Sequence, residues 1–240
     1  MVNPGQAPGS AKYLGEPRDS SIHIDLIAYT PDTVTALDDV SAQEACSALE
    51  NGGISWVDVD GIHDADMVKR VAERFQIHPL SVEDVLNPEG RPKAEYYPNY
   101  IYVVLRMVTR DPEDDALDTE QVSLFLGQDF VLTFQEHDGD VFGPVRKRLR
   151  DPNTRLRQHG TDFLAYSILD AVVDSYFGVL GGLESQVDAL DILEPQDLPT
   201  DTPQQLHQIR RQLRRLRQSL RPLREAIAAL SRSPDAWIKP

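Results

Sequence analysis

Two adjacent carboxylates, Glu83 and Asp84, stand in the middle of a short predicted helix that begins at Pro79. Proline suits the first position of a helix, because its missing N–H would have no intrahelical partner there. Pro88 ends the segment, since a proline biases the residue before it away from the helical region. The apolar residues of the segment are expected to form one face: Leu80, Val82, Val85 and Leu86. Adjacent acids repel unless positive charge lies between them. The pair is therefore either two solvated surface acids or half of a divalent-cation site.

A second pair of acids lies far along the chain. Asp170 and Asp174 are four residues apart in a predicted helix, so they share one face. Like charges at this spacing cost roughly a few tenths of a kcal/mol unless they are paired. Mg²⁺ takes one or two carboxylates and keeps several waters. Glu83, Asp84, Asp170 and, more weakly, Asp174 are therefore the candidate ligands of a weak, hydrated metal site.

Other chemistry has little support in the sequence. The six histidines are scattered without the spacing of a tetrahedral zinc site. There is no glycine-rich phosphate loop and no Gly-x-Ser-x-Gly nucleophile motif. We therefore expect no catalytic residue, and a metal-dependent hydrolase built on the same acids is a weak alternative.

Composition narrows the class of partner and the compartment. A formal net charge of −15 argues against nucleic acid, because phosphate contacts need a basic surface. The single cysteine, Cys46, rules out an internal disulfide and fits a reducing compartment. Residues 1–21 show no signal peptide, and the longest apolar run, Tyr100–Leu105, is too short to span a bilayer. The sequence as given reads as soluble.

The chain divides into three predicted parts. Residues 1–20 are rich in proline and glycine and read as a flexible arm, residues 21–158 mix strands and helices, and residues 159–240 read as a helical hairpin. In the middle part we expect strands at 22–29, 54–60, 100–109, 121–126 and 130–135, and helices at 42–49, 65–75 and about 140–150. The fold class is α/β, an αβα sandwich with a mixed sheet followed by a long antiparallel helical hairpin.

The hairpin is predicted from two helices at about 161–194 and 202–232 that carry apolar residues at alternating spacings of three and four. The two seams are Tyr166, Leu169, Val173, Tyr176, Leu180, Leu183, Val187, Leu190 and Leu206, Ile209, Leu213, Leu216, Leu220, Leu223, Ile227, Leu230. The first helix has seven acids and no lysine or arginine, whereas the second has eight arginines and the single acid Glu225. We expect these opposite charges to pair and to set the register of the two helices.

Several motifs, in order along the chain, resemble the cytoplasmic domain of the CorA family of magnesium and cobalt channels. They are Gly61-Ile62-His63, Ile77 to Asn87, Arg91 to Glu95, Glu120 to Leu124, Phe134-Gln135-Glu136, Gly139 to Phe142, Ser167 to Asp174, and Pro222 to Glu225. The resemblance runs from about residue 22 to the end of the chain. Many ordered matches make it stronger than any single motif.

The resemblance implies the same sandwich and hairpin, a homopentameric channel, and regulatory divalent-ion sites between neighbouring subunits. The position of Asp84 matches an acid of one inter-subunit site, and the positions of Glu83 and Asp170 match a second site nearby. Mg²⁺ or Co²⁺ is then both the regulatory and the transported ion. The full-length protein would sit with this domain on the cytoplasmic face of the inner membrane.

The family continues into a stalk helix, two membrane spans and a Gly-Met-Asn signature, which this sequence lacks. The resemblance is therefore to a soluble fragment that ends before the stalk and the membrane, with incomplete metal sites. The leading hypothesis is a divalent-cation-sensing gating domain whose ion keeps the pore closed. The alternatives are the same domain of a zinc-transporting relative and a non-metal coiled-coil adaptor.

Overall fold

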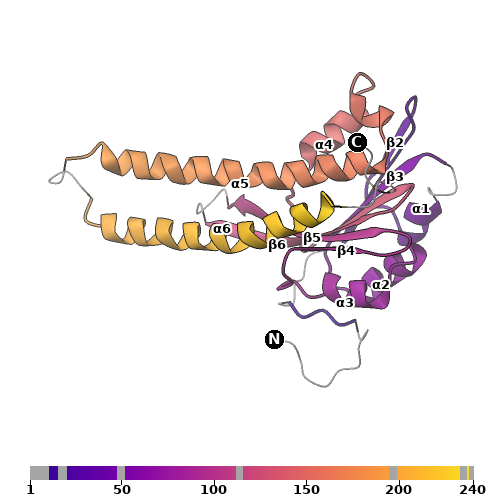
Figure 1. The fold of residues 1–240 in the computed structure, drawn as a ribbon, viewed down its shortest axis with the longest axis horizontal. Coiled ribbons are helices and arrows are strands. Elements are labelled where there is room, and N and C mark those ends of the chain that lie inside the picture. The colour runs from indigo at the N-terminus through magenta and orange to yellow at the C-terminus, as the bar shows by residue number, and fades with distance from the viewer. Residues whose placement is uncertain are drawn as a thin grey trace.

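The computed structural model describes residues 11–15, 21–47, 52–111, 116–194, 199–232 and residue 237. Within these residues, one sheet of seven strands is flanked by helices (Figure 1). The elements along the chain are β1 (His23–Tyr29), β2 (Val34–Leu37), α1 (Ala42–Ser47), β3 (Ile54–Asp60), α2 (Ala65–Arg74), α3 (Pro79–Val85), β4 (Lys93–Tyr96), β5 (Ile101–Arg110), β6 (Leu117–Leu126), β7 (Phe130–Gln135), α4 (Gly143–Arg150), a 3₁₀ turn (Arg155–Gln158), α5 (Thr161–Asp191) and α6 (Thr202–Leu230).

The strands follow the order β2-β1-β3-β7-β6-β5-β4 across the sheet. Only the pair β3–β7 is parallel, and the remaining neighbours are antiparallel. β6 and β7 form a β-hairpin, in which Gly127 N donates to Phe130 O over 2.9 Å. The mixed sheet predicted from the sequence is confirmed.

Both faces of the sheet are buried, and β5 shows the division most clearly. Ile101, Val103 and Leu105 belong to a core shared with α4, α5 and α6. Tyr102 and Val104 belong to a second core, shared with α2 and α3. Successive side chains of a strand point to opposite faces, so the sheet separates the two helical layers. This is the αβα sandwich that the sequence predicts.

Local signals placed several elements correctly. Asp64 caps α2, because its side chain accepts hydrogen bonds from Asp66 N and Met67 N over 2.9 and 3.0 Å. Ser41 and Glu44 form the reciprocal capping box ahead of α1. The end of the helix predicted over 42–49 lies outside the described residues.

Other expectations need correction. Leu80 was expected on the apolar face of the short helix, but it is 45% exposed, whereas Val82, Val85 and Leu86 are buried. Because α3 has only two turns, it presents one narrow stripe to the sheet. The strand predicted over 100–109, by contrast, is confirmed as β5, which pairs with β4 on one side and with β6 on the other.

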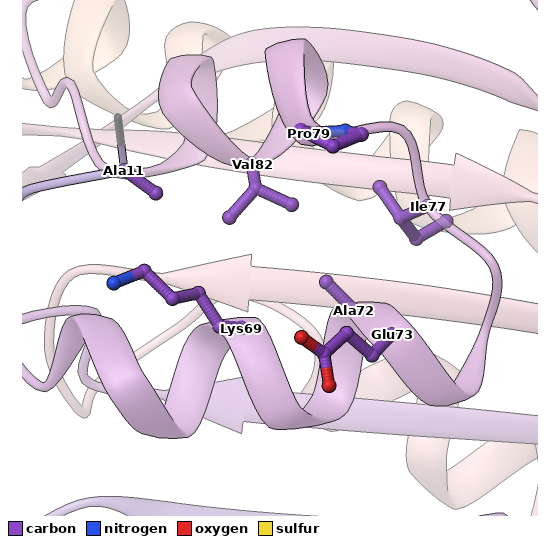
Figure 2. A pocket seen from close by; sticks show the side chains of 7 residues that line it. All are labelled: Ala11, Lys69, Ala72, Glu73, Ile77, Pro79 and Val82. Atoms are coloured by element: carbon purple, nitrogen blue, oxygen red, sulfur yellow. The ribbon is translucent and has the colours of Figure 1, made fainter. Parts of the chain in front are cut away.

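Part of the predicted N-terminal arm packs on the sandwich. Leu14 N donates a hydrogen bond to Leu86 O over 3.0 Å, and Ala11 and Tyr13 lie against the core on the α2–α3 side. Figure 2 shows Ala11 beside the groove between α2 and α3. Residues 1–10 and 16–20 of that arm lie outside the described part of the chain.

The helix α5 is both the longest element and the main cover of one sheet face. Leu164, Ile168 and Val172 are buried against the sheet, and Tyr176 Oη donates to Arg106 O over 2.8 Å. By length and composition alone α5 could cross a membrane. Its buried contacts instead identify it as a core helix of the sandwich, and its C-terminal half extends beyond the sheet with α6 beside it (Figure 1).

Only alternate residues of the predicted apolar seam of α6 are buried. Ile209, Leu216, Leu223 and Leu230 are buried, but Leu206, Leu213, Leu220 and Ile227, which alternate with them, are exposed. The expected charge pairing between the two long helices is also wrong for the described residues. The ion pair that the structure shows on α6 lies within that helix and joins Arg221 Nε to Glu225 Oε1 at 3.8 Å. The arginines of α6 are exposed.

The half-used seam gives a matched pair of substitutions. Leu216→Ala should lower the free energy of unfolding by about 2–5 kcal/mol, because it removes a buried side chain and leaves a cavity. Leu213→Ala, one turn away and exposed, should cost at most about 1 kcal/mol. Urea unfolding at low protein concentration measures both. Equal losses would contradict the assignment of the two stripes.

Candidate metal site

The acids of α3 face outward because the opposite side of the helix packs on the sheet. His78 Nδ1 accepts a hydrogen bond from Leu80 N over 3.2 Å at the start of the helix, and His78 N donates to Tyr100 Oη over 3.0 Å. Val82 and Val85 are buried against the sheet. Glu83 and Asp84 therefore fall on the outer half of the helix, where both are partly exposed.

Asp84 already has a cationic partner. Lys93 Nζ, on the edge strand β4, lies 2.7 Å from Asp84 Oδ2 and 2.8 Å from Glu95 Oε1. Burial lowers the pKa of Lys93, but its hydrogen bonds to Asp84 and Glu95 outweigh that effect and hold the pKa above its ordinary value. The ammonium group thus bridges two carboxylates at a half-exposed position.

The loop between α3 and β4 holds this bridge in place. Gln121 Nε2 donates to Asp84 O over 2.9 Å, and Arg106 Nη2 donates to Gly90 O over 3.0 Å. Gly90 approaches Gln121 closely, because a Cβ at this position would lie 2.6 Å from Gln121 Oε1. Two buried strands therefore set the position of α3 relative to Lys93.

Asp170 and Asp174 lie on α5 and are exposed. The side of α5 that faces the sheet is apolar, and both aspartates are on the opposite side of the helix. Since α3 and α5 cover different faces of the sheet, a single chain does not bring Glu83 and Asp84 together with Asp170 and Asp174. In the described part of the chain, no group of three or more histidines, cysteines and acids could hold a metal ion.

Lys93 and Glu95 are the participants that sequence reasoning missed. Both residues lie in the motif Arg91 to Glu95, which carries part of the family resemblance, but no role was assigned to them. Their spacing of two, on a strand, places them on the same face of the sheet. That signal was not usable without knowing that residues 93–96 form a strand.

A separate buried cluster lies at the carboxyl ends of β3 and β7. Asp58 and Asp140 both pair with Arg146 of α4, and Gln135 Nε2 donates to Asp60 Oδ1 over 2.8 Å. Burial raises the pKa of Asp58 to about 6, and burial with the charge of Asp58 raises the pKa of Asp60 to about 8. Asp58 and Asp140 share the guanidinium of Arg146, and these ion pairs tie α4 to the sheet.

Glu120 on β6 is a second buried acid. Its Oε2 accepts hydrogen bonds from Glu136 N over 3.0 Å and from His137 N over 3.3 Å. Burial raises the pKa of Glu120 to about 9, and the charge of Glu136 adds to that effect. This acid joins the end of β7 to β6 and is remote from solvent, so it acts in stability.

Comparison with known proteins identifies relatives of the whole chain. Residues 51–240 match a family model described as CorA-like Mg²⁺ transporter protein. The cobalt/magnesium transport protein CorA of Thermotoga maritima is 38% identical over 209 residues, which cover 86% of this chain and 59% of that protein.

Solved structures share the fold. The soluble domain of CorA from Methanocaldococcus jannaschii superposes with a TM-score of 0.70 at 17% identity, covering 88% of this chain and 80% of that one. The ZntB cytoplasmic domain from Vibrio parahaemolyticus gives a TM-score of 0.66 at 12% identity, over 88% of this chain and 80% of that one. At these identities the likeness concerns the fold alone.

The buried acid Glu120 predicts a pH dependence. An acid whose pKa is raised by folding destabilises the folded state as pH rises between its ordinary value, 4.5, and its folded value, about 9. Glu120→Gln keeps an acceptor for the two N–H groups but removes the ionisation. The variant should therefore gain stability relative to the parent as pH rises from 5 to 8, by up to about 1.4 kcal/mol per pH unit.

Chemical denaturation at several pH values measures this difference. Glu73→Gln, at an exposed position on α2, is the matched control and should follow the parent at every pH. Parallel pH profiles for Glu120→Gln and the parent would contradict the buried, protonated state of Glu120.

Proposed function

The chain belongs to the CorA family, and from this premise we propose that it is the cytoplasmic, divalent-ion-sensing domain of a CorA-type Mg²⁺/Co²⁺ channel. It spans 59% of the length of its Thermotoga relative, so transport itself is assigned to the longer protein. In that protein the domain would form a homopentamer on the cytoplasmic face of the membrane. The domain senses the ion and has no enzymatic role.

One observation carries the proposal, namely the placement of the candidate acids on opposite faces of one sheet. Glu83 and Asp84 point outward from one helical layer, and Asp170 and Asp174 point outward from the other. A ring of copies brings one face of each protomer against the other face of its neighbour, because a head-to-tail interface joins two different surfaces. Acids from the two layers then meet between copies, where a divalent ion bridges them.

The energetics suit a sensor. Mg²⁺ retains most of its water and binds through one or two carboxylates, which gives weak affinity. An ion at about ten times its Kd adds roughly 1.4 kcal/mol to the bound state, so several interfaces act together. When the ion leaves, repulsion within a chain of net charge −15 loosens the assembly and opens the pore.

Lys93 competes with the ion for Asp84. Its ammonium group neutralises Asp84 and Glu95 in the absence of metal, so the ion has to displace it to reach the Asp84 carboxylate. This competition weakens the site and sets the concentration at which it fills. A residue of the same chain thereby tunes the sensor.

The fold shared with the ZntB domain keeps a zinc-transporting relative as the alternative, and Zn²⁺ belongs in the same titrations. The exposed leucines of α6 favour the second alternative, a coiled-coil adaptor that needs no metal. An adaptor would show no response of its melting temperature to any divalent ion.

Metal titration of ligand variants tests the proposal. Mg²⁺ or Co²⁺ should raise the melting temperature of the parent, and Asp84→Ala or Asp170→Ala should reduce that shift by half or more, because each removes one carboxylate of a bridge. Glu73→Ala, an exposed acid of α2, is the control and should respond like the parent. Undiminished stabilisation in both variants would remove Asp84 and Asp170 from the ligand set.

Substitution of the competing lysine should act in the opposite direction. Lys93→Ala should lower stability without metal by at most about 1 kcal/mol, since the ion pairs are partly exposed. The same variant should bind Mg²⁺ more tightly, because Asp84 and Glu95 no longer have a resident cation. Isothermal titration calorimetry compares the affinities, and an unchanged or weaker affinity would argue against displacement of Lys93.

A further inference from the structure

A pocket of about 670 Å³ opens between the start of β1, the first turn of α1 and one side of α2, on the sheet face that α2 and α3 cover. Small-molecule sites occupy roughly 300–1,000 Å³, so the pocket has the size of a ligand site. Its floor is aliphatic and is formed by Ile22, Ile24, Val40 and Met67. Ile24 and Met67 are each only 6% exposed, so the floor is continuous with the core. The pocket can therefore shelter an apolar group from water.

Two arginines of α2 stand at the rim of this pocket. Arg70 and Arg74 are four residues apart, so they share one side of the helix, and both line the pocket. Within the described part of the chain, neither guanidinium forms an ion pair or a hydrogen bond, whereas the neighbouring Lys69 pairs with Asp66 at 3.2 Å. Like charges at this spacing repel each other. An anion between the two guanidinium groups would relieve that repulsion and accept hydrogen bonds from both.

The acids near the pocket are engaged elsewhere or lie at its margin. Asp64 accepts hydrogen bonds from two backbone N–H groups as the cap of α2. Glu44 accepts a hydrogen bond from Ser41 Oγ over 2.7 Å. Glu73 lines both this pocket and the groove between α2 and α3, where Figure 2 shows its carboxylate, so it stands on the ridge between the two. The two arginines are therefore the charged groups that the rim offers to a ligand.

We propose that this pocket binds an aliphatic anion, a small molecule with one alkyl chain and a phosphate or carboxylate head. The chain lies on the aliphatic floor, and the head bridges Arg70 and Arg74. The described lining residues include no aromatic side chain, which favours an alkyl chain over a planar ring that would need a stacking partner. A phosphate monoester is preferred to a carboxylate, because it carries more charge and three acceptor oxygens.

The pocket is separate from the candidate ion ligands, which lie on α3 and α5. Its ligand needs no divalent ion, because the arginines supply the positive charge. Binding measured in EDTA therefore tests this inference without testing the ion-sensing proposal, and either can fail alone.

Isothermal titration calorimetry in EDTA tests the pocket on the 240-residue chain, with decyl phosphate kept below the concentration at which it forms micelles. The parent should bind one decyl phosphate per chain. Octyl phosphate should bind roughly tenfold more weakly, because two methylenes no longer cover the floor. Inorganic phosphate, which is the head alone, and decyltrimethylammonium, which has the same chain with a cationic head, should show no binding at the same concentrations.

Substitutions at the rim separate the pocket from a general effect of charge. Arg70→Gln with Arg74→Gln should weaken the binding of decyl phosphate by roughly tenfold or more, because the head loses its charged donors. The control Lys147→Gln with Arg148→Gln removes the same charge from exposed positions on α4, across the sheet, and should bind like the parent. Ala42→Asp places a carboxylate in the first turn of α1, where the helix dipole favours it, and should weaken binding by competing for the arginines.

Circular dichroism and urea unfolding check that each variant is folded. The inference is overturned if the parent does not bind decyl phosphate, if inorganic phosphate or the alkyl cation binds as tightly, or if the arginine variant and the α4 control bind alike. Binding to vesicles of phosphatidylglycerol without binding to free decyl phosphate also overturns it, because the anion would then belong to a membrane surface.

Discussion

Burial of the sheet on both faces is the constraint on which the other features depend. Alternate residues of β5 point into different cores, so the helical layers of α3 and α5 cannot meet within one protomer. Under the function proposed above, the acids that these layers carry become partners across a boundary between copies. A property that looks local in the sequence, two short acidic motifs, becomes a property of an assembly.

The chain has fewer basic than acidic residues, and the positions of the basic residues determine which acids have a cationic partner within the chain. Arg146 is committed to Asp58 and Asp140 at the end of the sheet, and Lys93 is committed to Asp84. The arginines of α6, by contrast, face solvent. The buried acids Asp58 and Asp140 thus pair inside the chain, whereas Asp170 and Asp174 of α5 are exposed to solvent.

The sequence was sufficient to predict the elements that are determined by short-range patterns. The caps at Ser41 and Asp64, the hairpin at residues 127–129 and both long helices follow from local chemistry. The strands β2 and β4 were missed, because each has four residues at an edge and its pairing is determined by its neighbour. The candidate acids were named from the sequence, but Lys93 was not assigned to Asp84, since their proximity depends on where β4 lies. Heptad spacing likewise could not reveal that only alternate leucines of α6 are buried.

The helix α5 is fixed at one end and extends freely at the other. Its N-terminal half is clamped to β5, and its 31 residues span about 46 Å at 1.5 Å per residue. Such a rod is a lever, and a tilt of about 5° at its root would displace its tip by about 4 Å. A small change in the tilt of α5 where it contacts the sheet would therefore produce a larger displacement at the far end of the helical hairpin.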